Sequence, residues 1–182
     1  GLDGEEGARA RILAGRFPAA TLRQFEAMLD YFGERPFIVR SSSRLEDRYG
    51  NAFAGQYDSV FCVNQGTREQ RLADLLDAVR QVYASTLSEQ ALRYRQRRGL
   101  LDEHEQMALL IMRVSGTAGG RYFHPHAAGV GLSVNPYPWN PRIDMKAGVV
   151  RLVAGLGTRA VDRADDDYTR LVALNAPELR PE

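Results

Sequence analysis

Arg40 is followed by Ser41, Ser42 and Ser43, in the stretch Phe-Ile-Val-Arg-Ser-Ser-Ser. The apolar residues before Arg40 predict a short buried strand over 37–39, and the serines predict a polar loop after it. A guanidinium offers a fixed fork of donors to a phosphate, and hydroxyls and successive loop amides add further donors. This arrangement indicates a phosphate-binding loop.

Other stretches carry glycines that permit a tight turn or a close approach of backbone to a ligand. Ala54-Gly55 is a small-residue turn before an apolar run, 57–63, that predicts a second strand. Gly155-Leu156-Gly157 follows a further apolar run and has the same freedom. The glycines of 116–120 lack a strand-to-helix context, so they predict a hairpin turn.

The spacing of the candidate residues gives little support for a metal site or for a catalytic nucleophile. His124 and His126 would share one face of an extended segment, but no carboxylate or cysteine stands beside them at ligand spacing. The aspartates within 162–167 lack the alternation and the central glycine of a calcium loop and predict a solvated turn. No serine, histidine and acid are spaced as a nucleophilic triad. We therefore predict no metal ligands.

Three amphipathic helices are predicted to position these residues. One runs over 18–33, beginning at a proline and ending at a glycine. The next begins at a Thr-x-x-Gln capping box at residue 67 and carries an apolar stripe to residue 83. A second box, Thr86 with Glu89, predicts a third helix that runs to Gly99.

The third helix carries Arg93, Arg95, Arg97 and Arg98, which are predicted to form a solvated face; a site for an acidic partner is the alternative. The run 107–112 has little polar interruption and predicts a strand buried on both faces.

The remaining chain predicts strands over 129–134 and 149–153, separated by a proline-rich loop over 135–141. Residues 171–174 form another short apolar run, and residues 1–17 predict a linker or a frayed helix.

Composition places the chain among ordinary globular proteins. Its 182 residues predict one domain or two small ones, and a net charge of +1 gives no electrostatic case for nucleic acid or a membrane surface. No membrane span or signal peptide is evident, and the single cysteine, Cys62, is predicted to be a core residue. These features predict a cytoplasmic protein. Lys146 is the one lysine among 24 basic residues.

The stretch 39–47 with Phe-Ala-Gly-Gln at 53–56 resembles the signature of the nucleotide-binding domain of the phosphoenolpyruvate synthase and pyruvate phosphate dikinase family. Residues 84–87 together with 91–95 resemble the family's helical segment. Residues 128–136 and 155–157 resemble its distal strands. All these stretches follow one another along the chain in the same order as in the family.

The resemblance implies an α+β, ATP-grasp-like fold, with a mixed, mainly antiparallel sheet, packed helices and an incomplete domain over 18–182. It implies ATP and magnesium as cofactors. It also implies phosphorylation of a histidine on a separate, swivelling phosphohistidine carrier domain of a parent protein, and a third domain that passes the phosphoryl group to pyruvate.

The resemblance also implies roles for single residues. Arg40 would be the catalytic contact to the transferred phosphates, and a loop containing Gly55 and Gln56 would close over them. A strand passing Met112 and Val114 would border the adenine. The full set of nucleotide contacts is Arg40, Ser41, Ser42, Gly55, Gln56, Met112, Val114 and Gly157.

The chain departs from the family pattern in ways that bear on catalysis. The phosphate-binding lysine is expected upstream of the chain, and Lys146 cannot replace it by position. A glutamate, glutamine and arginine segment is expected beyond Glu182. Where relatives carry a glutamate before the Gly-Leu-Gly turn, this chain has Arg151, and a guanidinium there would repel magnesium.

Three functional hypotheses follow. The chain is the ATP-binding part of a phosphotransferase and inactive alone, or a divergent regulatory module that binds nucleotide without catalysis, or a scaffold that contacts another protein through its arginine-rich helix.

Overall fold

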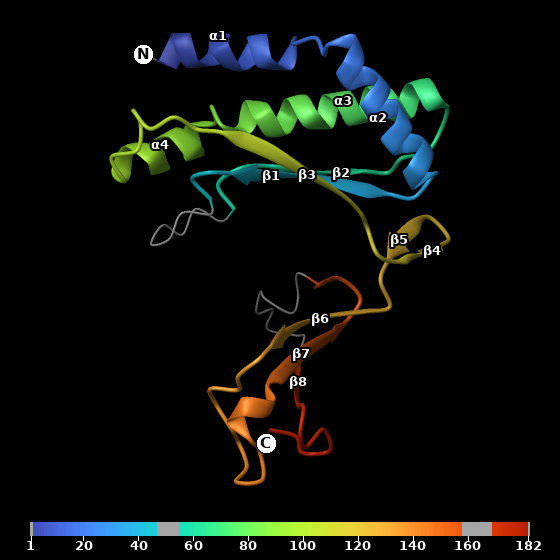
Figure 1. Ribbon diagram of the computed structural model, residues 1–182, viewed down its shortest axis with the longest axis vertical. Coiled ribbons are helices and arrows are strands. Elements are labelled where there is room, and N and C mark those ends of the chain that lie inside the picture. Colours follow the sequence, from blue (N-terminus) through green and yellow to red (C-terminus); the bar gives the residue numbers. More distant parts are fainter. Residues whose placement is uncertain (1, 47–54, 158–168, 182) are drawn as a thin grey trace. The chain divides into compact units, whose positions relative to one another are not determined.

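The computed structural model describes residues 2–46, 55–157 and 169–181 (Figure 1). The chain divides into two compact units, Gly1–Val114 and Ser115–Glu182, which we call unit 1 and unit 2 and describe separately. In the described residues, α-helices occur in unit 1, and both units contain antiparallel sheets. The predicted combination of helices with a mainly antiparallel sheet is confirmed at this level.

Unit 1 is a sheet with helices on one side (Figure 1). Its elements are α1 (Leu2–Leu13), α2 (Ala19–Phe32), β1 (Phe37–Ser43), β2 (Ser59–Cys62), α3 (Arg68–Ser85), α4 (Glu89–Arg97) and β3 (Met107–Arg113). The three strands are ordered β2-β1-β3, and both pairs are antiparallel. The helices α2 and α3 pack on the sheet, and α1 packs on α3.

The core of unit 1 lies between the sheet and these helices. Phe37 and Val39 of β1 are fully buried against Leu29 of α2 and Leu75 of α3. Cys62, at the end of β2, belongs to the same cluster, as predicted. Its burial raises the pKa of the thiol to about 11, so the thiol stays protonated near neutral pH.

Side-chain caps define where the helices begin. The predicted box at Thr67 is confirmed, because the Thr67 hydroxyl accepts from the Gln70 amide and the Gln70 side chain accepts from the Thr67 amide. The predicted second box at Thr86 is wrong. Ser88 caps α4 by accepting from the Ala91 amide, whereas the Thr86 hydroxyl donates to the Tyr83 carbonyl at 2.7 Å and so closes the end of α3.

Two predictions about the strands are also wrong. Strand β1 continues through the serines to Ser43, because β3 is long enough to pair with all seven of its residues. Strand β3 is not buried on both faces: Leu109 packs on the core, while Leu110 is 47% exposed. Helices cover only one face of this sheet in the described chain, so alternate residues of β3 meet solvent.

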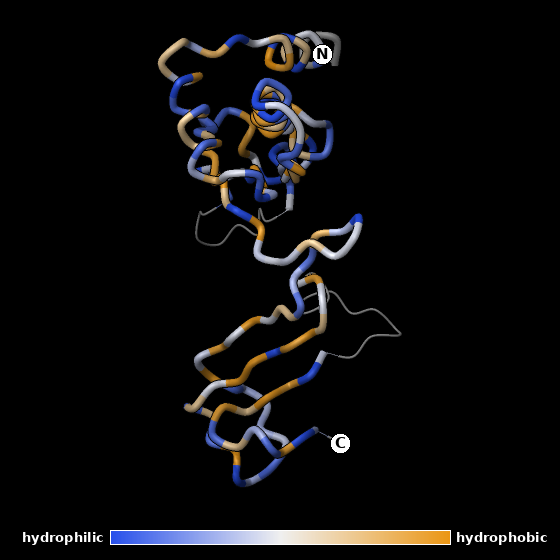
Figure 2. The backbone as a smooth tube through the Cα atoms, turned by 90° about the vertical axis from the view of Figure 1, so that its right-hand side faces the viewer, coloured by the Kyte–Doolittle hydropathy of each residue, from blue (hydrophilic) through white to orange (hydrophobic). Residues whose placement is uncertain are grey.

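Unit 2 consists of short strands. Its elements are β4 (Thr117–Gly119), β5 (Tyr122–His124), β6 (Ala127–Leu132), a 3-10 turn η1 (Met145–Ala147), β7 (Val149–Ala154) and β8 (Arg170–Ala173). Strands β4 and β5 form a hairpin at the predicted glycine cluster, and β6-β7-β8 form an antiparallel sheet. These three strands are largely orange, the hydrophobic colour, in Figure 2.

Strands β6 and β7 of the unit 2 sheet approach each other closely at Gly129. A Cβ atom at Gly129 would lie 2.3 Å from the Arg151 carbonyl oxygen, so only glycine fits beside β7 there. The proline-rich loop packs Trp139 against Ile143, Ala173 and Ala176 in a small core.

None of the described helices is long and apolar enough to cross a membrane.

Candidate functional site

Arg40 lies on the uncovered face of the unit 1 sheet. Its neighbour Val39 points into the core, so strand alternation turns Arg40 to the other side. Ser59 on β2 and Leu110 on β3 stand directly opposite it. Among the described residues, no side chain or carbonyl forms a hydrogen bond or an ion pair with its guanidinium. Arg40 is therefore an exposed cation whose donors are open to an anion.

Apolar side chains lie near Arg40 on this face, which we call the open face. Ile38 stands opposite Phe61 on β2 and opposite Met112 on β3, and directly opposite residues share a face. Phe61 is 70% exposed and Met112 is 36% exposed. A cation among exposed apolar side chains suits a ligand that joins a flat or apolar group to an anion.

The serines after Arg40 are divided between the two faces of the sheet. Ser42 shares the open face with Arg40, and Ser41 lies on the other face, where its hydroxyl donates to Glu46 Oε1 at 2.9 Å. The Ser43 amide donates to Glu46 Oε2 at 3.1 Å, and the Ser43 hydroxyl accepts from the Glu46 amide at 3.1 Å. The structure thus places Ser42 beside Arg40, while Glu46 binds the other two serines.

The other predicted site residues lie in several places. Met112 is on the open face, and the Val114 amide donates to the Pro36 carbonyl at 2.8 Å. Gly55 has a positive φ of 78°, and Gln56 lines a surface pocket beside Arg93 and Arg97 of α4. Phe53 and Ala54, the first half of the predicted closing loop, lie outside the described residues.

Gly157 belongs to unit 2, where a Cβ atom on it would lie 3.3 Å from the Ala128 Cβ. In the same unit, Arg151 is an exposed residue of β7 that pairs with Val130 and Leu171. The predicted aspartate turn within 162–167 lies outside the described residues.

In the described residues no group of three or more histidine, cysteine, aspartate or glutamate side chains could hold a metal ion. His124, at the end of β5, and His126, between β5 and β6, contact uncharged oxygen atoms. His126 Nε2 lies 3.2 Å from the Thr117 hydroxyl, and His124 Nδ1 lies 3.3 Å from the Pro125 carbonyl.

Arg95 departs from the predicted solvated face of α4, because it is only 8% exposed. Its guanidinium donates to the carbonyls of Leu100, Leu101 and Glu103 and so holds the loop after α4. The sequence carried one signal of this burial, because the small apolar residue Ala91 stands four residues earlier, on the same side of the helix; in the structure Ala91 is fully buried.

A partly buried pair of side chains near Arg95 has no signal in the sequence. The Tyr57 hydroxyl donates to Glu105, and burial together with this carboxylate raises the pKa of Tyr57 well above its usual range. The two residues are far apart in the chain, so only the fold brings them together.

The family model for the AMP/ATP-binding domain of pyruvate phosphate dikinase matches residues 3–180. The chain belongs to this family. The resemblance read from the Arg40 stretch is thereby confirmed, and ATP is supported as a ligand of this AMP/ATP-binding domain.

A rifampicin phosphotransferase from Streptomyces sviceus is 31% identical over 109 residues, which cover 59% of this chain and 11% of that protein. The chain therefore corresponds to a small part of this relative's length.

Proposed function

We propose that this AMP/ATP-binding domain is the ATP-binding part of a phosphoenolpyruvate synthase-like phosphotransferase. The observation that carries the proposal is Arg40, whose exposed guanidinium has no partner among the described residues and lies beside apolar side chains of the sheet, in a chain that belongs to this family. An exposed cation beside apolar surface matches a nucleotide, whose phosphates are anionic and whose base is flat.

In this proposal Arg40 holds the transferred phosphates and neutralises charge that develops on them. Such stabilisation by fixed donors is the main protein contribution to phosphoryl transfer. Ser42 lies on the same face and adds a hydroxyl, and Met112 offers apolar surface to the base. Gly55 and Gln56 close over the phosphates, as in an ATP-grasp fold, and the family resemblance implies Gly157 as a further nucleotide contact.

Magnesium would supply further charge neutralisation at the phosphates. The described residues hold no carboxylate cluster for it, so in this proposal the ion arrives with the nucleotide. The acceptor is a histidine on a separate carrier domain of a larger cytoplasmic protein, and the final acceptor is pyruvate or another small molecule. The relative's name makes an antibiotic one such candidate.

A second candidate is a regulatory module that binds nucleotide without catalysis. Arg151 favours it, because β7 presents an exposed guanidinium where the family pattern has a glutamate that could face magnesium. A protein-contact scaffold, the third hypothesis, requires no nucleotide at all.

The test is a thermal-shift titration with ATP and magnesium of the wild-type chain, Arg40→Ala and Arg23→Ala. Arg23 is an exposed arginine on α2, on the helical side of the sheet, and serves as the matched control. A ligand at a hundred times its dissociation constant stabilises the native state by about 2.7 kcal/mol. For a domain of this size that is a rise in Tm of roughly 5–10 °C.

We expect that rise in the wild type and in Arg23→Ala, and its loss in Arg40→Ala. An equal rise in Tm in all three proteins would show that Arg40 does not bind the nucleotide. No rise in Tm in any of them would favour the protein-contact scaffold. Phosphohistidine formation in the full-length parent then separates catalysis from regulation.

A further inference from the structure

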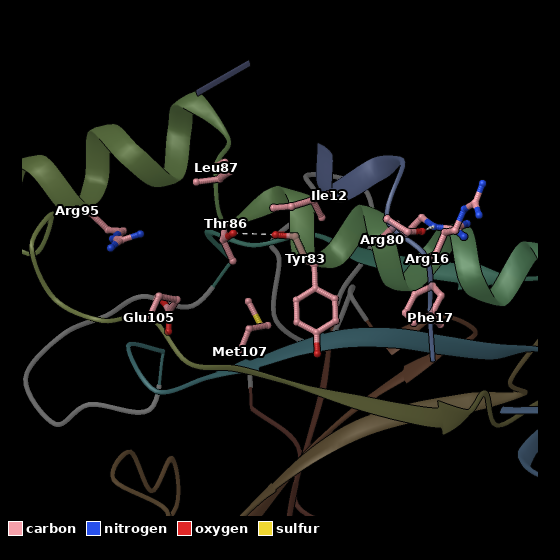
Figure 3. A pocket seen from close by; sticks show the side chains of 11 residues that line it. Ile12, Arg16, Phe17, Arg80, Tyr83, Thr86, Leu87, Arg95, Glu105 and Met107 are labelled. Atoms are coloured by element: carbon pink, nitrogen blue, oxygen red, sulfur yellow. Dashed lines mark hydrogen bonds between the residues drawn. The ribbon is translucent and has the colours of Figure 1, made fainter. Parts of the chain in front are cut away.

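A pocket of about 430 Å³ lies in unit 1 on the helical side of the sheet (Figure 3). Its walls come from the end of α1 and the link to α2, the end of α3, and the start of β3. Its lining includes Ile12, Phe17, Tyr83, Leu87 and Met107, which make most of the wall apolar. This volume is within the range of pockets that bind small organic molecules.

Arg95 points into this pocket from α4 (Figure 3). The side chain is only 8% exposed, so its charge has little contact with bulk water. Nε donates to the Leu100 carbonyl at 3.4 Å, and Nη2 donates to the carbonyls of Leu101 and Glu103 at 3.3 and 3.0 Å. Nη1 has no hydrogen-bond partner among the described residues and is not among the fully buried atoms, so its donors can be reached by a ligand in the pocket.

The charges that line the pocket favour an anion. Arg95 stands at one end, and Arg16 and Arg80 stand at the other (Figure 3). Among the described residues that line the pocket, Glu105 is the acidic one. It accepts from the Tyr57 hydroxyl through Oε2, and its Oε1 is buried without a hydrogen-bond partner in the described chain. The described bonds of Arg95 go to backbone carbonyls and not to this carboxylate.

Arg80 is already engaged in part. Its Nε donates to the Gly15 carbonyl at 2.9 Å, its Nη1 pairs with Asp77 at 2.6 Å, and its guanidinium lies 5.2 Å from the centre of the Phe17 ring. Arg95 is therefore the nearly buried cation with a nitrogen left for a ligand.

We propose that this pocket binds a small organic anion, a carboxylate attached to an aromatic or branched apolar body. The carboxylate accepts from Nη1 of Arg95, and the body lies against Met107, Tyr83 and Leu87. Met107 faces the helices, whereas Arg40 faces the other side of the same sheet, so this site is separate from the proposed nucleotide site.

The first test uses phenylacetate as the probe and phenylacetamide, which has the same shape without the charge, as the control. Both are titrated into the 182-residue chain and followed by ¹H–¹⁵N NMR. We expect phenylacetate to shift the amides of Thr86, Leu87, Arg95 and Met107, and to leave those of Ile38 and Arg40 unchanged. A hydrogen bond to a charged group contributes about 1.5–3 kcal/mol, so the amide should bind at least about tenfold more weakly.

The proposal is overturned if both probes bind equally, if the shifts lie on the open face, or if phenylacetate has no effect at roughly 10 mM, ten times the dissociation constant of a millimolar ligand. Equal and scattered shifts would mean nonspecific contact only.

Variants add an independent test. Arg95→Gln should lose the preference for the anion, with its fold checked by circular dichroism because Arg95 also holds the loop after α4. If Arg95→Gln does not fold, the two-probe comparison is repeated in Arg16→Gln, which removes an exposed cation from the lining. A preference for phenylacetate over phenylacetamide that persists in Arg16→Gln supports Arg95 as the partner of the carboxylate, and a preference lost in Arg16→Gln contradicts it.

Discussion

Leu109 and Leu110 are identical neighbours on β3 with opposite surroundings. Leu109 packs on the core beneath α2 and α3, and Leu110 stands on the open face opposite Arg40. The same alternation separates Val39 from Arg40 on β1 and Cys62 from Phe61 on β2. Hydropathy alone does not decide which side chain is buried, because the helices cover one face of the unit 1 sheet and leave its other face exposed.

The comparison also separates stability from binding. The covered face holds the buried side chains that stabilise unit 1, and the open face holds a cation among apolar side chains. Mutations on the two faces should therefore have different consequences.

The largest expected effect is on the covered face. Leu75→Ala should lower the free energy of unfolding by about 2–5 kcal/mol, because Leu75 is fully buried and its loss leaves a cavity. Leu110→Ala, the same change on the open face, should alter it by about 0.5 kcal/mol or less. Urea unfolding at an unchanged m-value measures both. Similar losses at the two sites would mean that something covers the open face in solution.

The next effect concerns nucleotide binding. Leu110→Glu places a carboxylate opposite Arg40, where it competes with a phosphate for the guanidinium. ATP affinity, measured by titration calorimetry, should fall by about tenfold or more, since bonds to charged groups contribute about 1.5–3 kcal/mol. Leu110→Gln is the control of equal size, and an equal fall in that variant would contradict an electrostatic role for Arg40.

A smaller effect is expected from the cap of α3, the helix that covers the sheet. Thr67→Ala removes the acceptor for the Gln70 amide and should lower the free energy of unfolding by about 1 kcal/mol. Thr67→Ser keeps a hydroxyl and should retain most of the stability. Thermal unfolding of the three proteins checks this order, which fails if the serine variant is as unstable as the alanine variant.

The smallest effect is expected from the exposed pair that joins α2 to α3. Arg68 donates to both oxygens of Asp30, at 3.1 and 2.9 Å, and this guanidinium lowers the pKa of Asp30. A lowered folded-state pKa adds stability that is complete above the unfolded value, near 4, and is lost as the pH falls through the folded value. The difference between wild type and Asp30→Asn should therefore shrink below about pH 4. Unfolding curves from pH 3 to pH 7 test this, and a constant difference would contradict it.

Local rules in the sequence predicted part of the fold correctly. The proline start and glycine end located α2, and the Thr-x-x-Gln box located the start of α3. These signals work because the bonds that begin or end a helix are made within a few residues. Thr86 misled for the same reason. Its hydroxyl could bond to an amide of the following helix or to a carbonyl of the preceding one, and in the structure it donates to the Tyr83 carbonyl of the preceding helix.

For the candidate site, sequence reasoning selected Arg40, and its role in binding ATP stays a prediction. It could not assign the serines, because their surroundings depend on a distant strand. Pairing with β3 makes Ser41, Ser42 and Ser43 part of β1, so their side chains alternate between the two faces of the sheet.

The sequence by itself determined the family, the helix caps of α2 and α3, and the apolar segments that become strands, since all of these depend on residues close together in the chain. Only the tertiary structure decided that the face with Arg40 is open, that Arg95 is buried and that Tyr57 meets Glu105. These outcomes depend on which surfaces cover one another. Contacts between segments far apart in the sequence decide which surfaces become buried, and no local sequence pattern encodes those contacts.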